Sequence, residues 1–359
     1  MKRFHSICLL LLCKCVDLFA QDPRFSLFNE APALLNPALT GANHPLRASV
    51  QYKEQWRGAV RPFQTYGLSF ETRFGPSTWE QVDKHRGMTF KEKSLRRLAA
   101  GISIYSAREA GGSLNSTWIN LSLAWFVPLN KYHSLSAGLQ TSLVQRKADN
   151  SSFLFPNQYG AGGYDQSLPS GEKFNNLYYV YPDLSLGAMW AFNREEKRIG
   201  SNNRVKANAG FAVYHVAQGA GNFLNSSAMR YKRWVGHASA LLPTGTSRLA
   251  IMPSFQWQMQ GRAQNITAGF LLKQYYRYNS KYTGLVRRSS VNYGLYISPR
   301  DAVTAVFMVE MGEQYSIGLS YDITVSSLAG VVKSRGGLEC VFRYTPPRGF
   351  LYEEKTLPE

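Results

Sequence analysis

The sequence predicts an all-β protein, an antiparallel transmembrane β-barrel of the outer membrane with about 14 strands. Many stretches of roughly 9–13 residues alternate apolar and polar side chains at a period of two, which gives a strand two distinct faces. Such strands are longer than the roughly 5–6 residues of ordinary strands, and about 9–11 tilted residues cross a bilayer, which favours a transmembrane barrel over the alternative of a soluble β-sandwich assembly. Because no helical pattern separates these stretches, neighbouring strands must pair antiparallel.

The clearest strand is residues 314–327, QYSIGLSYDITVSS. Alternate residues from Ile317 to Val325 are apolar, and the residues between them are small or polar. In a barrel the apolar face meets lipid and the polar face lines the lumen, so we expect Asp322 to point inward. The charged residues that could join it there, if the strand registers allow, are Glu310, Glu339, Arg343 and Arg73.

The same alternation recurs along the chain. The candidate strands span residues 47–55, 62–74, 98–106, 115–127, 133–146, 183–193, 204–216, 234–242, 248–260, 265–273, 291–298, 302–310, 314–327 and 336–344. Their connections are unequal in length, which favours tight turns on one side of the membrane and larger loops on the other. The longest connection, residues 147–182, has no periodicity and is predicted to be a loop.

The two ends of the chain fall outside the strands. Residues 1–20 have the basic start and apolar centre of a secretory signal. A lipoprotein signal is the alternative, but no small-residue pair precedes a cysteine that could carry lipid. Residues 21–46 are irregular, and their prolines forbid a long helix. Because this segment is also rich in apolar residues, it is either a plain lead-in or a plug or docking segment. The barrel is predicted over 47–344, with a tail over 345–359.

Composition narrows the chemistry of the protein. The formal net charge of +18 suggests anionic partners such as lipid phosphates or an acidic protein surface. No nucleic-acid-binding motif accompanies this charge, so nucleic acid is not expected as a partner. Past the signal only Cys340 remains, which excludes an internal disulfide. The histidines are dispersed and no nucleophile–base arrangement occurs, so we predict no catalytic, cofactor or metal site.

Five short motifs carry a family likeness: QDPRFS at 21–26, LNPALTG at 35–41, YKEQW at 52–56, GLSYDITVSSL at 318–328 and GLE at 337–339. In this order they resemble the PorP/SprF family of type IX secretion system outer-membrane proteins from Bacteroidetes. The resemblance covers nearly the whole chain past the signal. The residues that it makes candidates for docking or for the family motif are Asp22, Pro23, Phe25, Asn36, Pro37, Gly41, Gln55, Trp56, Tyr321 and Asp322.

The resemblance implies a non-enzymatic barrel that works with the type IX secretion or gliding machinery. Its expected partners are outer-membrane lipids, periplasmic ring and lipoprotein components of the machinery, and a secreted adhesin with a C-terminal secretion domain. Its expected role is export of the adhesin or its attachment to the surface. The alternative is an outer-membrane porin or solute channel, which would need an open lumen.

Two connections are strongly basic. They follow the second and tenth candidate strands, so both would face the periplasm if both termini are periplasmic. Such residues either form solvated loops that touch lipid phosphates or dock an acidic periplasmic partner. The docking candidates are Arg86, Lys91, Lys93, Arg96, Arg97, Arg277, Arg287 and Arg288.

Overall fold

The fold is that of a computed structural model of the whole chain. The residues that it describes are 22–56, 62–74, 77–83, 88–94, 97–109, 113–149, 155–160, 162–165, 167–171, 177–195, 204–217, 231–244, 248–277, 289–299, 301–326, 329–332 and 335–346. Within them, no helix is long and apolar enough to cross a membrane.

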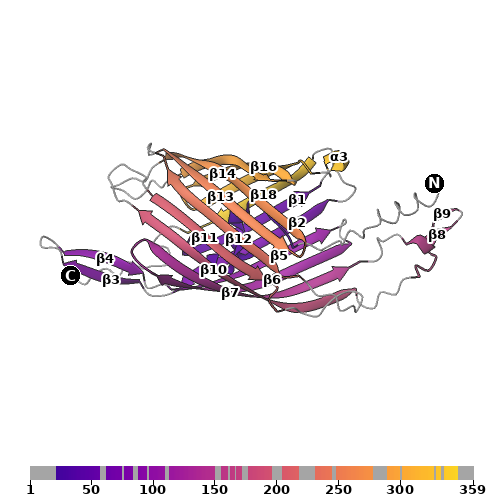
Figure 1. The fold of residues 1–359 in the computed structure, drawn as a ribbon, viewed down its shortest axis with the longest axis horizontal. Helices are drawn as coiled ribbons and strands as arrows, with labels where there is room; N and C mark the ends of the chain where they lie inside the picture. Colours follow the sequence, from indigo (N-terminus) through magenta and orange to yellow (C-terminus); the bar gives the residue numbers. More distant parts are fainter. Residues whose placement is uncertain are drawn as a thin grey trace, which may run out of the picture.

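Fourteen antiparallel strands of the described residues close into one barrel, which confirms the predicted fold class (Figure 1). Each strand pairs with its neighbour along the chain, and β1 closes the barrel against β18. The barrel strands are β1 (Leu46–Gln55), β2 (Phe63–Phe74), β5 (Leu98–Glu109), β6 (Leu114–Pro128), β7 (His133–Ala148), β10 (Tyr178–Glu195), β11 (Arg204–Tyr214), β12 (Arg233–Pro243), β13 (Leu249–Gln260), β14 (Ala263–Arg277), β15 (Ser289–Ser298), β16 (Ala302–Met311), β17 (Tyr315–Thr324) and β18 (Arg335–Tyr344).

The structure adds elements that periodicity did not reveal. A hairpin of β3 (Ser77–Asp83) and β4 (Met88–Ser94) occupies the basic connection after β2 and extends beyond the barrel (Figure 1). Two short strands, β8 (Tyr159–Gly160) and β9 (Gly163–Tyr164), lie in the long connection that follows β7. β10 begins at Tyr178, several residues earlier than expected, because this tyrosine-rich stretch pairs with β7 despite Pro182.

The barrel has two rims. We call the end where β1 begins and β18 ends the first rim, and the opposite end the second rim. The expectation of tight turns on one side only is wrong. The long connection after β7 and the short turn at Gly261 both lie at the second rim, whereas the basic connection after β2 and the short turn at Gly312 lie at the first.

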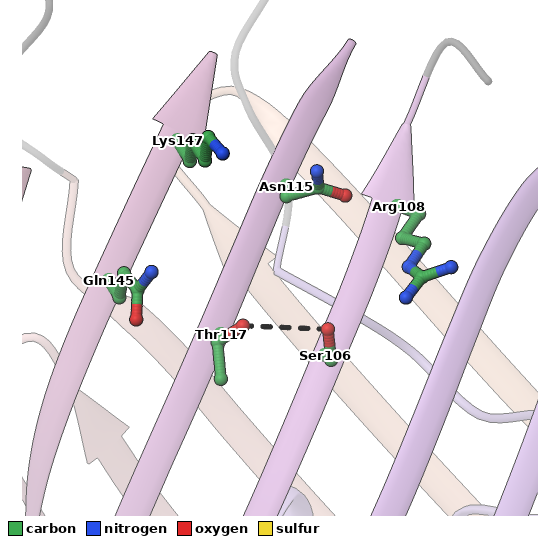
Figure 2. A pocket seen from close by; sticks show the side chains of 6 residues that line it. All are labelled: Ser106, Arg108, Asn115, Thr117, Gln145 and Lys147. Carbon is green, nitrogen blue, oxygen red and sulfur yellow. Dashed lines mark hydrogen bonds between the residues drawn. The ribbon is translucent and has the colours of Figure 1, made fainter. Parts of the chain in front are cut away.

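The outer face of the barrel is apolar. On β17 the outward residues Ile317, Leu319, Tyr321 and Ile323 are each more than 40% exposed, while the residues between them, including Asp322, are buried. Such a surface suits lipid rather than water. Towards the second rim, the outer face of β5, β6 and β7 becomes polar (Figure 2).

The N-terminal segment lies inside the barrel. It folds into short helical turns, η1 (Phe28–Glu30), α2 (Pro32–Leu35) and η2 (Pro37–Leu39). The turn η2 contacts β6, β7 and β10, and its backbone accepts a hydrogen bond from Ser136 on the inner face of β7. We call residues 22–45 the plug. One more helical turn, α3 (Ala329–Val332), precedes β18 at the second rim.

The plug runs through the lumen from rim to rim. Asp22 contacts His215, which follows β11 at the second rim, whereas Glu30 contacts Arg47 and Arg343 at the first rim. The first and last described parts of the chain therefore lie at opposite rims. Asp22 is at the second rim, and Thr345, next to the end of β18, is at the first.

Candidate functional site

The plug fills the lumen with a shared apolar core. Leu27, Phe28, Leu35 and Leu39 are buried together with apolar residues from the inner faces of the strands. The ring of Phe28 lies 5.4 Å from that of Tyr296 on β15, measured between centroids. Fully burying a side chain of this size stabilises by about 1.5–3 kcal/mol, so packing alone strongly favours the seated plug.

At the second rim the plug is fastened by a buried histidine between two carboxylates. His215 Nε2 lies 2.6 Å from Asp22 of the plug, and its Nδ1 lies 2.7 Å from Asp183 on β10. Both nitrogens can donate only in the imidazolium form. Burial lowers the pKa of His215, but the carboxylates of Asp22 and Asp183 outweigh it and raise the pKa from 6.5 to about 9. Arg233 also pairs with Asp22, at 3.5 Å.

The contact of His215 with Asp22 and Asp183 should make the free energy of unfolding depend on pH. Since the pKa of His215 is raised on folding, its contribution is complete below 6.5 and is lost as the pH rises through about 9. The difference between the two values corresponds to roughly 3 kcal/mol as an upper bound. We expect the gap in urea midpoint between the native protein and His215→Gln to shrink from pH 6 to pH 10. At pH 6 the gap should be smaller in an Asp22→Asn background; a gap that is constant with pH would contradict this role.

Further into the lumen, one lysine contacts two carboxylates of the wall and a hydroxyl of the plug. Lys53 Nζ lies 3.1 Å from Asp322, 3.7 Å from Glu339 and 2.6 Å from the hydroxyl of Ser26. Ser26 in turn donates its backbone N–H to Glu339 at 2.7 Å and its hydroxyl to Asp322 at 2.8 Å. The side chains of Lys53 and Glu339 are each 1% exposed, so one cation faces two carboxyl groups in a nearly dry site.

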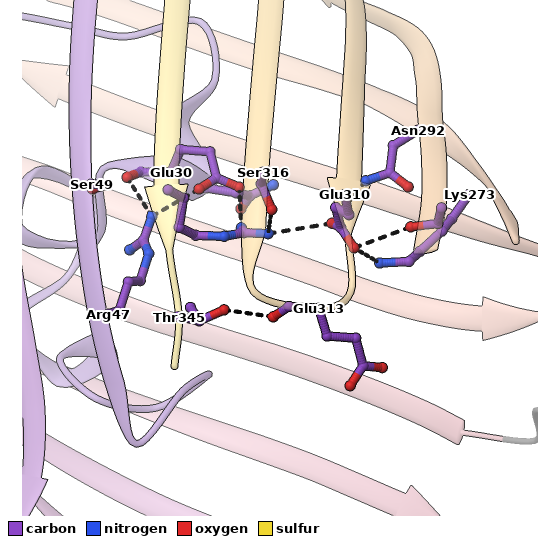
Figure 3. Close-up of polar contacts among 12 residues, drawn as sticks. Glu30, Arg47, Ser49, Lys273, Asn292, Glu310, Glu313, Ser316 and Thr345 are labelled. Atoms are coloured by element: carbon purple, nitrogen blue, oxygen red, sulfur yellow. Dashed lines mark hydrogen bonds and ion pairs between the residues drawn. The ribbon is translucent and has the colours of Figure 1, made fainter. Parts of the chain in front are cut away.

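At the first rim Glu30 of the plug sits between two arginines (Figure 3). Its carboxylate lies 2.9 Å from Arg47 and 2.6 Å from Arg343. Burial raises the pKa of Glu30, but Arg343 and Arg47 more than offset this effect and hold the pKa below its usual value. The arginines extend the network along the wall: Arg47 pairs with Glu71, and Arg343 with Glu310, each at 3.3 Å. Glu310 also pairs with Lys273.

The middle of the plug is seated by Asn36, which is fully buried. Its amide nitrogen lies 3.0 Å from both His237 Nε2 and the carbonyl oxygen of Ala188, and its side-chain oxygen accepts from Ala38 N at 2.9 Å. Glycines on the facing strands make room for this turn. A Cβ at Gly138 would lie 2.2 Å from Ala38 N, and one at Gly187 would lie 2.0 Å from Asn36 Oδ1. Larger residues there would displace the plug.

Several motif residues meet in a cleft at the second rim. Phe25, Gln55, Trp56 and Asp322 all line it, although they lie in three separate motifs. Trp56 has a positive φ of 57°, is 38% exposed, and packs edge-on against Phe63 with ring centroids 6.0 Å apart. The junction between plug and wall thus presents an exposed aromatic side chain.

The remaining motif residues have other positions. Pro23 and Pro37 are buried in the plug. Gly41 has a φ of +66°, and a Cβ there would lie 2.6 Å from that of Ala99, so it forms the close turn before β1. Tyr321 is on the outer face and does not join the cleft.

The basic docking candidates are only partly described. Lys91 and Lys93 are on β4 of the first-rim hairpin, and Arg277 ends β14 at the same rim. Arg97 precedes β5 there and is exposed. Arg86, Arg96, Arg287 and Arg288 lie outside the described residues.

The charged residues expected around Asp322 lie in three different places. Glu339 is close to Asp322, and Lys53 pairs with both of them. Glu310 and Arg343 instead pair with each other near the first rim. Arg73 stacks on the ring of Phe126 at 3.8 Å instead. Sequence reasoning did not single out Lys53, Glu30 or His215. Lys53 had a detectable signal, because it shares the polar face of β1 with Arg47, Ser49 and Gln51.

Among the described residues no group of three or more His, Cys, Asp or Glu side chains could hold a metal ion. The buried charges of the described residues are instead arranged in clusters that contain both signs. What the arrangement can do chemically is hold the plug in the lumen through contacts at both rims.

Comparison with known proteins gives one match to a family. The sequence model of a family described as type IX secretion system membrane protein PorP/SprF matches residues 18–344. A search of curated proteins found no match.

Solved structures resemble the chain only distantly. A KdgM porin in complex with disordered oligogalacturonate is 7% identical over 83% of this chain and 99% of its own, with a TM-score of 0.35. CdiB from Acinetobacter baumannii is 8% identical over 84% and 60%, with a TM-score of 0.42. BamA from Haemophilus ducreyi lacking POTRA domains 1–3 is 10% identical over 83% and 69%, with a TM-score of 0.39.

Proposed function

The chain belongs to the PorP/SprF family of type IX secretion system membrane proteins, and from this we propose that it is a non-enzymatic docking barrel of the outer membrane. In this role it supports the export or surface attachment of an adhesin-type cargo and docks periplasmic components of the secretion or gliding machinery.

The observation that carries the proposal is the filled lumen. The plug passes through the barrel and is fastened at both rims by buried ion pairs. A solute channel needs a continuous wet path, and a lumen packed with apolar side chains and paired charges does not offer one. The alternative function as a porin is therefore disfavoured, and binding at the two rims is favoured.

The rims differ in the partners that they suit. We assign the first rim to the periplasm, because the barrel begins and ends there. The connection after β2, which forms the β3–β4 hairpin, carries six Lys or Arg residues against three carboxylates, and this excess of positive charge suits an acidic partner. At the second rim, the exposed ring of Trp56 beside the plug is the kind of aromatic anchor that dominates protein interfaces. We assign the cargo to this rim.

Two double variants test this division. The protein, carrying a C-terminal affinity tag, is isolated from gently solubilised membranes and the co-purifying proteins are quantified. Arg96→Glu/Arg97→Glu should lower recovery of periplasmic components by about tenfold or more and leave the adhesin unchanged, because charge reversal converts attraction into repulsion. Gln55→Ala/Trp56→Ala should lower recovery of the adhesin and leave recovery of the periplasmic components unchanged, since truncating an aromatic anchor costs about 2 kcal/mol or more of binding free energy.

Each variant serves as the control for the other. A third variant, Lys131→Glu/Arg248→Glu, reverses two charges in other first-rim connections and should change neither recovery. If every variant recovered both partners in the same amounts as the native protein, the docking role would be overturned.

A further inference from the structure

The outer wall has a polar groove next to the second rim, away from the plug. Between Leu98 and Ile104 on β5, Val127 and Ile119 on β6, and Leu135 and Leu143 on β7, the outward residues are apolar apart from Thr141, and they end in a row formed by Ile104, Ile119 and Leu143. Beyond that row they become polar or basic on all three strands at once. This change marks the level where the hydrocarbon layer ends and the headgroups begin.

The groove is built as two rows across the three strands (Figure 2). Strand register places Ser106, Thr117 and Gln145 in the row next to the apolar surface, and Arg108, Asn115 and Lys147 in the next row outward. Thr117 donates a long hydrogen bond to Ser106, at 3.4 Å. These six side chains line a groove of about 310 Å³.

The groove is cationic. Arg108 and Lys147 are exposed on its two sides, and none of its lining residues carries a carboxylate. Glu109, the next residue to Arg108, has the opposite direction in the alternation of β5 and faces the lumen. The nearest carboxylate along β7 is Asp149, which lies beyond Lys147 and does not line the groove.

Aromatic residues flank the groove on the outer face. The guanidinium of Arg108 lies 5.5 Å from the ring centroid of Tyr66 on β2. On the other side, Tyr178 of β10 is opposite Lys147 in the register, and both tyrosine rings are exposed. Aromatic girdles occupy the interface between lipid and water in such barrels, which places the groove at headgroup depth.

We propose that this groove binds the phosphate-bearing headgroup of an anionic membrane lipid. Arg108 and Lys147, on strands separated by one other strand, are about 10 Å apart, so they can flank one headgroup. The hydroxyl and amide groups of Ser106, Thr117, Asn115 and Gln145 supply neutral hydrogen bonds, and the acyl chains continue down the apolar row. The proposal does not depend on the docking role, because the groove lies on the lipid-facing wall.

The test measures lipid binding to purified, delipidated protein by native mass spectrometry. Phosphatidylglycerol is titrated against the native protein, Arg108→Gln/Lys147→Gln, and the control Lys131→Gln/Lys232→Gln, which also loses two exposed positive charges. We expect the first variant to bind about 25-fold more weakly, roughly fivefold for each cation near the membrane surface, and the control to bind normally. All the substituted residues are exposed, so folding should be unaffected.

Two further ligands distinguish the source of the anion. Phosphatidylcholine should bind much more weakly than phosphatidylglycerol, because its headgroup is neutral overall, and inorganic phosphate should fail to displace the lipid at millimolar concentration. Equal binding of the two lipids, unchanged binding by Arg108→Gln/Lys147→Gln, or displacement by free phosphate would each overturn the proposal.

Discussion

Deleting residues 22–44 is expected to turn a closed barrel into an open pore. In planar bilayers the native protein should show no stable channel steps. The deletion variant should raise the conductance per inserted barrel roughly tenfold or more, because a barrel of this size without internal packing holds a water-filled lumen. Single-channel recording of the two purified proteins provides the measurement.

The barrel should survive the deletion for a physical reason. The plug covers many charged groups of the wall, including Lys53, Glu71 and Glu310. Once the plug is gone, water enters the lumen and hydrates them, so no unpaired charge remains in a dry site. The strand pairing itself is independent of the plug, because every barrel strand has a neighbour on both sides.

A second variant tests the same point without shortening the chain. Gly138→Val/Gly187→Val places side chains where the plug turn now touches the wall, and should also produce conducting pores. Gly236→Val is the matched control, since its Cβ would meet only ordinary contacts on the outer face, the nearest at 3.5 Å. Large steady conductance from the native protein would support the porin alternative instead.

Replacing Lys53 with methionine is expected to cost about 3–5 kcal/mol of unfolding free energy. The substitution keeps the apolar stem but removes the cation that pairs with both Asp322 and Glu339. Two carboxylates would then share a buried site without a compensating charge. Urea titration of tryptophan fluorescence, with the heat-modifiable mobility of the barrel on gels as a second readout, would measure the loss.

A second substitution that restores part of the lost stability would show that the unpaired carboxylates cause the loss. Lys53→Met/Glu339→Gln removes one carboxylate together with the lysine and should recover much of the lost stability, since a neutral amide tolerates burial better than an unpaired charge. Lys131→Met, at an exposed turn, should change stability by less than about 0.5 kcal/mol. If Lys53→Met were as stable as the native protein, the ion cluster would not hold the plug.

The barrel could be predicted from the sequence because its information is local. A strand of alternating residues carries its own evidence, so β17 and its inward Asp322 follow from the stretch around them. The β3–β4 hairpin and the early start of β10 were not predicted. In both, a polar or proline-containing sequence forms a strand because it pairs with another strand. Periodicity within one strand cannot predict such pairing.

The candidate site depended on contacts across the lumen. Alternation predicted that Asp322 and Glu339 face inward, but not that Lys53 and one serine of the plug join them. Ser26 and Glu339 are 313 residues apart in sequence, so only the closed barrel brings them together. The same reason explains why Glu310 joined Arg343 rather than Asp322: the partner of an inward charge depends on its height in the barrel, which is set by strand register.

By itself, then, the sequence determined the β-barrel, the two faces of its strands and the family motifs, because each resides in a short stretch of residues. Only the tertiary structure decided that residues 22–45 fill the lumen, that they pass from the second rim to the first, and which charges fasten them. A flexible lead-in and a seated plug can have the same local composition. They differ in whether the inner faces of distant strands supply matching pockets, as Gly138 and Gly187 do for the turn at Asn36.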